Sequence, residues 1–270
     1  MKLLNQMKGD GFVQNVHYLT NMKYAVWEGE KMIKIENVET MGWGGAIRGM
    51  RNAMNSWDKS DSKFCRLDCI TTDVNLDEEP CNFMCGGNLY RGFLQIGEAD
   101  MKLCKNLIKA GSSDRKFMRM IHVQADVTAP QYWWREFDTY KIATTANSTS
   151  QMHKIHSRNL TLDDFSHEHL DEKGIKALET IIAAINDYRV SYKETKDKED
   201  WYRMIQLIPQ SSHYLRTVDL NYETLLSIYH QRKNHKLGEW REFCKWIETL
   251  PYMKEFLGLD ESSGSEEAKE

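Results

Sequence analysis

An alternating segment that runs into a cluster of aromatic residues constrains the fold of this chain most. In KFMRMIHVQADVT, residues 116–128, every second residue from Phe117 onward is apolar except Arg119, a pattern typical of a half-buried strand. Pro130 follows and predicts the start of a helix over QYWWREF, whose aromatic side chains favour the core or a subunit interface. The segment therefore predicts a domain that combines strands with helices.

The other elements follow from the same two periodicities. Residues 33–41 alternate and predict a short strand, and the segment after Pro209 predicts another. Helices are expected over 42–57, over 97–111 with Gly111 as the stop, within 161–192, just before Pro209, and in one or two pieces over 222–250. The polar stretch TTANSTSQMHKIHSRN, residues 144–159, is expected to be a loop. The predicted fold class is α+β, with helices dominating.

Composition narrows the classes of function. The chain has 270 residues, enough for one large domain or two small ones, with ordinary shares of hydrophobic (41%) and charged (28%) residues. Its net charge of −4 argues against nucleic acid as a main partner. No apolar run reaches the roughly 18 residues of a membrane span, and the N-terminal segment lacks the apolar core of a signal peptide. We therefore expect a cytoplasmic protein whose six cysteines are mostly reduced.

Shifts in composition divide the chain. The first residues lack periodicity, and both Met1 and Met32 are candidates for the true start. The last residues are acidic and rich in serine and glycine, which is typical of disorder. The expected parts are an N-terminal extension (1–31), one domain (32–255) with a cysteine-bearing insertion (62–92), and a disordered acidic tail (256–270).

Two kinds of metal-ligating side chain occur in short spacings. The insertion carries two cysteine pairs with three-residue gaps: Cys65 and Cys69, then Cys81 and Cys85. Such pairs suit a structural zinc site, although a gap of three is less typical than a gap of two, so zinc and free thiols both stay open. Histidines recur at His153, His156, His167 and His169, where polar roles at helix starts are favoured over metal binding. No metal site is assigned.

Four stretches, taken in order, carry a resemblance to a known family. They are AIRGMRNAMNSWDKSD, DMKLCKNLIKAGSSDRKFMRMIHVQADVTAP, EFDTYKIATTANSTSQMH and QLIPQSSHYLRTVDLNYETLLSIYHQRKNHKLGEWREF. The chain resembles the flavin-dependent thymidylate synthase family over roughly residues 33–250, most specifically where Asn221 is followed eleven residues later by Arg232. The resemblance implies a thymidylate synthase-complementing-protein-like domain with a central antiparallel sheet and long helices. It also implies a homotetramer with active sites between subunits.

The chain departs from the family at several positions. The family's Arg-His-Arg falls on Thr139, Tyr140 and Lys141, so only the last of these keeps its charge. In the next motif an asparagine and a serine are kept as Asn147 and Ser150, whereas Ser148, Met152 and His153 replace a glutamate, an arginine and a tyrosine. An arginine expected before the Leu-Pro motif falls on Ile205, with Arg203 as the nearest substitute. The fold carries over better than the chemistry.

The resemblance also implies an activity and its residues. Members of the family methylate dUMP to dTMP with FAD as cofactor, methylenetetrahydrofolate as carbon donor and NADPH as reductant, and the same or a closely related pyrimidine nucleotide reaction is expected here. Arg232 is the implied catalytic residue, in contact with the uracil ring. The implied substrate contacts are Ser148, Ser150, Arg203 and Arg232. The implied cofactor contacts are Tyr140, Lys141, Asn147, Asn221 and His235.

Plainer interpretations of the same residues stay open. Arg232 also suits an exposed helix charge, Asn221 a helix N-cap, and His235 a helix surface. The hydroxyl and amide groups of 144–159 also suit turns that satisfy their own backbone. Because two charges of the Arg-His-Arg motif are lost, the alternative function is a noncatalytic nucleotide-binding or structural protein that kept the fold.

Overall fold

A central antiparallel sheet organises the protein, as seen in a computed structural model that describes residues 27–28, 32–64 and 94–259. Its strands follow the order β1 (Trp27–Glu28), β2 (Lys34–Met41), β5 (His122–Pro130), β7 (His213–Asn221) and β6 (Thr144–Ser148). Two further strands, β3 (Lys63–Phe64) and β4 (Leu94–Gln95), form a small separate sheet. The expected α+β class and central antiparallel sheet are confirmed.

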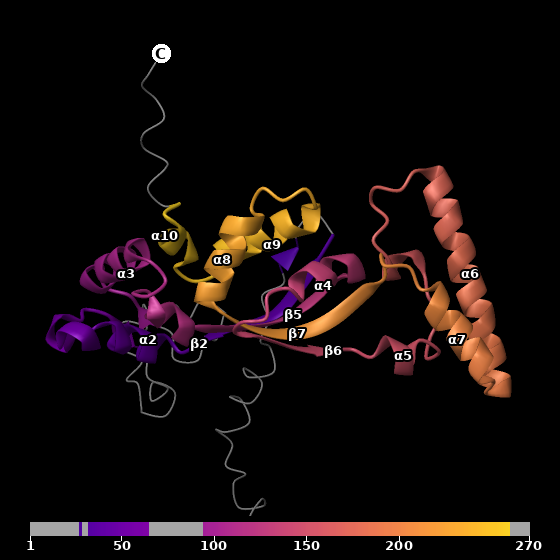
Figure 1. Cartoon of the computed structure of the whole chain (residues 1–270), viewed down its shortest axis with the longest axis horizontal. Helices are drawn as coiled ribbons and strands as arrows, with labels where there is room; N and C mark the ends of the chain where they lie inside the picture. Colours follow the sequence, from indigo (N-terminus) through magenta and orange to yellow (C-terminus); the bar gives the residue numbers. More distant parts are fainter. Residues whose placement is uncertain (1–26, 29–31, 65–93, 260–270) are drawn as a thin grey trace, which may run out of the picture.

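Helices cover the sheet and both of its ends (Figure 1). The helices α4 (Gln131–Phe137), α8 (Tyr222–Arg232) and α9 (Gly238–Thr249) lie over one side of the sheet. One end carries α2 (Trp43–Met50), α3 (Glu98–Ala110) and α10 (Met253–Leu257). The other end carries α5 (Gln151–Lys154), α6 (Glu172–Thr195) and α7 (Lys198–Leu207).

The strand β5 and the aromatic helix α4 form the centre of the core. Side chains on one side of β5 are almost completely buried. Trp133 of α4 packs with Trp240 and Phe243 of α9, and Trp134 packs against Trp133. The strand begins only at His122, because the preceding residues turn into a short 3-10 helix. The alternation expected from Phe117 onward is thus confirmed in its second half.

The polar stretch after α4 is not a loop over its whole length. Its first part is β6, which pairs with β7 from Thr144 opposite Leu220 to Ser148 opposite Arg216. Because β6 is the last strand of the sheet, its side chains can be polar while its backbone is satisfied by β7. This arrangement explains why hydrogen-bonding residues follow a buried aromatic helix directly.

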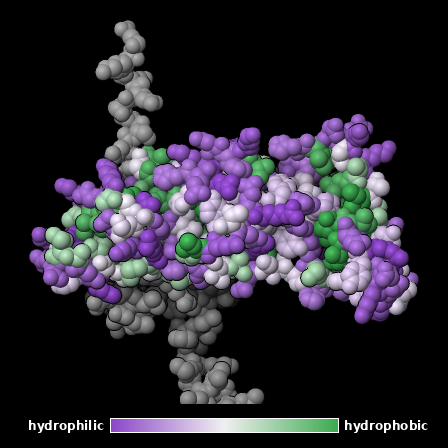
Figure 2. All heavy atoms as spheres, in the orientation of Figure 1, coloured by the Kyte–Doolittle hydropathy of each residue, from purple (hydrophilic) through white to green (hydrophobic). Residues whose placement is uncertain are grey.

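The end formed by α6 and α7 has small hydrophobic clusters of its own. One gathers around Ile155, Ile185 and Met204, and another around Phe165, Leu178 and Ile182. Figure 2 shows hydrophobic residues gathered on this end of the molecule. Apolar side chains at its surface include Val190 and Tyr202, which are 48% and 50% exposed.

The limits of the described residues bear on the expected domain boundaries. Trp27 and Glu28, inside the expected extension, pair with β2. The ordered part continues past residue 255, because Phe256 of α10 is buried in the core. Of the two candidate start residues, Met1 lies outside the described residues and Met32 lies inside them. The four cysteines of the insertion lie outside them as well. No helix among the described residues is long and apolar enough to cross a membrane.

Candidate functional site

Three residues implied by the resemblance meet where α4 and α8 end. Arg232, the last residue of α8, donates from Nε to the hydroxyl oxygen of Tyr140 at 2.8 Å. Its guanidinium lies over two rings, 4.7 Å from the centroid of Trp240 and 5.6 Å from that of Tyr140. His235 lies within 3.0 Å of Arg232 Nη1. The Arg232 side chain is only 19% exposed, so it is not a free surface charge of the helix.

The carboxylate of Glu136, which no sequence pattern indicated, holds this cluster. Glu136 Oε2 accepts from Arg232 Nη1 at 2.7 Å and from Trp240 Nε1 at 3.0 Å. His235 Nδ1 accepts from the backbone N–H of Leu237, and its Nε2 lies 3.5 Å from the same carboxylate oxygen. Glu136 therefore neutralises and orients the guanidinium of Arg232.

A second arginine that was not among the expected site residues, Arg216, lies on β7, the strand that precedes α8. Arg216 of β7 stacks on Trp134 at 4.3 Å and donates from Nη1 to Asp138 at 2.6 Å. It lies on the same side of β7 as Val218 and Leu220, which are buried. An arginine on the buried side of a strand was the sequence signal for it, since such a charge needs a partner.

A cavity of about 270 Å³ lies between the end of α4 and the start of β6. Asp138, which holds Arg216, and Tyr140, which accepts from Arg232, both line it. The remaining lining residues are Phe137, Lys141, Thr144, Thr145 and Ala146. Lys141 is exposed at this wall and carries a positive charge. The lining thus carries one positive and one negative side chain, and two of its residues are bonded to the arginines.

The other implied cofactor residues take different positions. Asn221 is 5% exposed, and its side-chain oxygen accepts from the backbone N–H of Thr224, which makes it the N-cap of α8. The N-cap interpretation is therefore confirmed. Asn147 is exposed on β6 opposite Thr217, and Ser148 is exposed opposite Arg216.

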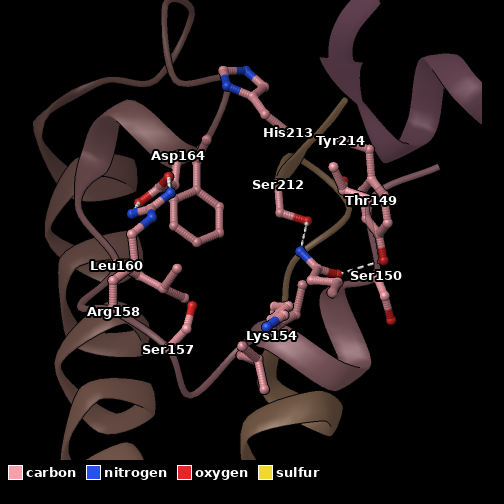
Figure 3. Close-up of a pocket in the computed structure, with 14 residues that line it drawn as sticks. Thr149, Ser150, Lys154, Ser157, Arg158, Leu160, Asp164, Ser212, His213 and Tyr214 are labelled. Atoms are coloured by element: carbon pink, nitrogen blue, oxygen red, sulfur yellow. Dashed lines mark hydrogen bonds and ion pairs between the residues drawn. The ribbon is translucent and has the colours of Figure 1, made fainter. Parts of the chain in front are cut away.

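Ser150 belongs to a second cavity of about 170 Å³, at the start of α5 (Figure 3). Its hydroxyl oxygen accepts from the backbone N–H of His153 and caps α5. One wall carries the ion pair of Arg158 and Asp164. The opposite wall carries a hydrogen-bond network of Ser212, Gln151 and Tyr214. Within one chain, Ser150 lines this cavity, whereas Arg232 is bonded to Tyr140 at the wall of the other one.

Arg203 lies on α7, away from both cavities. Its side chain is 48% exposed and pairs with Asp200 at 2.6 Å, one turn earlier on the same helix. The structure therefore groups Tyr140, Lys141, Arg232 and His235, and separates Ser150 and Arg203 from them.

Metal-ligating groups do not converge in the part of the chain that the structure describes. No group of three histidine, cysteine, aspartate or glutamate side chains suited to a metal ion occurs there. Two cysteines, Cys104 and Cys244, are buried, and burial raises the pKa of each thiol to about 12. They are packing residues rather than nucleophiles.

Comparison with known proteins relates the chain by its fold. No protein-family model and no curated protein sequence matches it. Two solved structures of the flavin-dependent thymidylate synthase from Helicobacter pylori, both with FAD and dUMP, are similar with a TM-score of 0.54. Their identities are 13% and 14%, over 83% of this chain and 98% and 97% of theirs.

A third solved structure is a UMP/dUMP methylase from Streptomyces cacaoi bound with 5-Br UMP. Its TM-score is 0.45 and its identity 11%, over 59% of this chain and 83% of that chain. The protein therefore has the fold of the flavin-dependent thymidylate synthases, as the resemblance implied, and the coverage of the Helicobacter pylori chain is nearly complete.

Proposed function

We propose that the protein binds FAD and dUMP and methylates dUMP to dTMP, or catalyses a closely related pyrimidine nucleotide reaction, with methylenetetrahydrofolate and NADPH as co-substrates. The observation that carries this proposal is the contact of Tyr140 with Arg232, 92 positions apart in the sequence. Both residues were implied by the resemblance as ligand contacts, and the fold that brings them together is that of the thymidylate synthases with FAD and dUMP.

The donor set fits the anionic part of a flavin nucleotide. Lys141 and Asn147 are exposed, and Tyr140 carries a hydroxyl group at the same cavity. An ammonium group beside amide and hydroxyl groups is the chemistry that phosphate oxygens require. Asn221 is buried as an N-cap and does not belong to this donor set within one chain. Bound FAD would supply the hydride chemistry, and the protein supplies charge and orientation.

Arg232 is the proposed catalytic residue. Its Nε and Nη1 are fixed by Tyr140 and Glu136, and its Nη2 has no hydrogen-bond partner in the described part of the chain. A guanidinium held by two partners keeps one edge oriented for a carbonyl oxygen. In the proposed reaction, that edge stabilises negative charge on the uracil ring.

A homotetramer is part of this proposal, because the proposed site residues do not all meet within one chain. Association of several copies is the arrangement that could complete a site from the Ser150 side of one chain and the Arg232 side of another. Exposed apolar side chains on the α6–α7 end, among them Val190 and Tyr202, support association. Light scattering of the purified protein measures the assembly directly.

A flavin spectrum is the first experiment. The purified protein is titrated with FAD and then with dUMP, while flavin absorption and fluorescence are recorded. Formation of dTMP is then followed by chromatography after methylenetetrahydrofolate and NADPH are added. We expect FAD binding, a change of flavin fluorescence with dUMP, and dTMP formation. Absence of binding by both ligands would reduce the relationship to one of fold.

One observation favours a second candidate, a noncatalytic nucleotide-binding protein. Glu136 already neutralises Arg232, and two positions of the Arg-His-Arg motif are the uncharged Thr139 and Tyr140. Both features weaken the field that would polarise a uracil ring. Binding of dUMP without FAD binding and without dTMP formation identifies this candidate.

A further inference from the structure

Arg216 is held in a way that a purely structural arginine does not require. Its guanidinium stacks on Trp134, and the indole N–H of Trp134 donates to the backbone oxygen of Tyr214, which fixes the ring. Only 18% of the Arg216 side chain is exposed. Its Nε is buried and has no hydrogen-bond partner in the described structure. The ring of Trp134 therefore fixes the guanidinium of Arg216, whose Nε still has a hydrogen bond to donate.

The partner of Arg216 is the more exposed half of the pair. Asp138 lies at the C-terminal end of α4, and its side chain is 55% exposed. It makes one good hydrogen bond to Arg216, at 2.6 Å, and a weak one at 3.5 Å. A half-exposed carboxylate can turn to water at little cost, because water solvates the released charge.

The charged side chains at the cavity and the register of β6 against β7 both favour an anion next to Arg216. Asp138 and Ala146 line the cavity, and Ser148 lies two residues further along the same side of β6, directly opposite Arg216. The charged side chains that line the cavity are Lys141 and Asp138, and Arg216 lies behind Asp138, to which it is bonded. When Asp138 turns away, Lys141 and Arg216 are the charges left at this wall, which favours one anionic group. The cavity volume of about 270 Å³ is sufficient for one such group.

We propose that this cavity is a phosphate-binding site in which Arg216 contacts the phosphate after Asp138 moves aside. A phosphate presents two oxygens to the guanidinium fork as the Asp138 carboxylate does, but carries more negative charge. Lys141 adds a second positive charge and Ser148 a hydroxyl donor. The identification of the phosphate as that of a nucleotide such as dUMP rests on the proposed function, whereas the anion site does not.

Variants at Arg216 and Asp138 test the site in the full-length protein. Inorganic phosphate, dUMP and deoxyuridine are titrated by calorimetry at constant ionic strength. We expect Arg216→Met to weaken phosphate and dUMP binding roughly tenfold or more and to leave deoxyuridine binding unchanged. Asp138→Asn should strengthen phosphate and dUMP binding, because the competing charge is removed. Arg216→Lys should be intermediate, since the charge stays and the fork is lost.

Arg115→Met is the matched control. Arg115 has a similar exposure (21%), forms an ion pair of 2.7 Å with Glu223, and does not line the cavity. It should leave phosphate binding unchanged. If the unmodified protein binds neither phosphate nor dUMP, or if Arg216→Met, Arg216→Lys and Asp138→Asn all bind phosphate as it does, the site is refuted. Phosphate binding that depends on Arg216, without dUMP binding, upholds the site and refutes the proposed function.

Discussion

Glu136 and Arg232, 96 positions apart in the sequence, form an ion pair of 2.7 Å that closes the junction of α4 and α8. The same carboxylate oxygen accepts from the indole of Trp240, so one acidic residue ties both helices to α9. This contact gives Glu136 two opposing effects, because it orients the guanidinium and also competes with any anion for it.

Replacement of Glu136 by glutamine separates these two effects. The amide oxygen can still accept hydrogen bonds, but the negative charge is gone, so we expect dUMP affinity to rise a few-fold, roughly 1 kcal/mol or less. We expect the melting temperature to fall, because the bonds from Arg232 and Trp240 lose their charged acceptor. Calorimetry and thermal unfolding measure the two quantities.

Glu223→Gln is the control for Glu136, since Glu223 also pairs with an arginine, Arg115, at 2.7 Å. It should lower stability without changing dUMP affinity. Weaker dUMP binding by Glu136→Gln would show that the carboxylate supports the ligand rather than competing with it.

Removal of the Arg232 side chain tests the proposed catalytic residue. We expect Arg232→Ala to lower dUMP affinity by roughly tenfold or more, because a charge-assisted hydrogen bond contributes about 1.5–3 kcal/mol. The protein should stay folded, as judged by circular dichroism, because the core beneath Trp240 is independent of this side chain. Unchanged affinity in a folded variant removes Arg232 from the site.

A buried ion pair at the other end of the sheet should control acid stability. Asp100 is fully buried and is bonded by Arg51, Ser60 and Ser62. Burial alone raises the pKa of Asp100, but the bonds from Ser62, Ser60 and Arg51 outweigh it and lower the pKa below 3.8. Because the folded pKa is depressed, the stabilisation is complete above the unfolded pKa and is lost as pH falls through the folded one.

Denaturant unfolding across the acidic range checks this expectation. Asp100→Asn should cost about 3–5 kcal/mol at neutral pH, because the charge of Arg51 is left buried without its partner. The variant should also lose part of the acid dependence. Asp187→Asn, at an exposed position of α6, should change neither. An acid dependence identical to that of the unmodified protein would refute the role of Asp100.

His213 should add a second pH dependence at the smaller cavity. Burial lowers the pKa of His213 from its usual 6.5, and its Nε2 faces the hydroxyl of Ser166 at 3.0 Å. Because the unfolded chain binds the proton more tightly, stability should fall as pH drops below about 6.5, by at most roughly 1.4 kcal/mol per pH unit. His213→Gln should flatten this dependence in unfolding curves. A slope that persists in the variant assigns it to other groups.

Local signals in the sequence were sufficient for β5, α4 and the N-cap at Asn221. Each depends on residues within a few positions of one another, so periodicity and capping preferences could reveal them. The strand β6 could not be distinguished from a loop, because an edge strand has no buried side that imposes alternation.

The contacts that define the candidate site were beyond such signals. Glu136 meets Arg232, and Asp138 meets Arg216, across 96 and 78 positions of the sequence. Nothing in the spacing of these residues indicates the pairs, because they are created by the packing of α4 against α8 and β7. The resemblance pointed to Arg232 and Tyr140, but it had no counterpart for Glu136 or Arg216.

The five-residue strand β6 connects the two cavities along the chain. Thr144 and Ala146 line the larger cavity, and Thr149 and Ser150, just beyond the strand, line the smaller one. If the pairing of β6 with β7 shifted by one residue, Ser148 would turn away from Arg216. The same shift would move Ser150 out of the smaller cavity. An insertion or deletion in this ribbon would therefore damage both places at once, whereas a point substitution could alter either one separately.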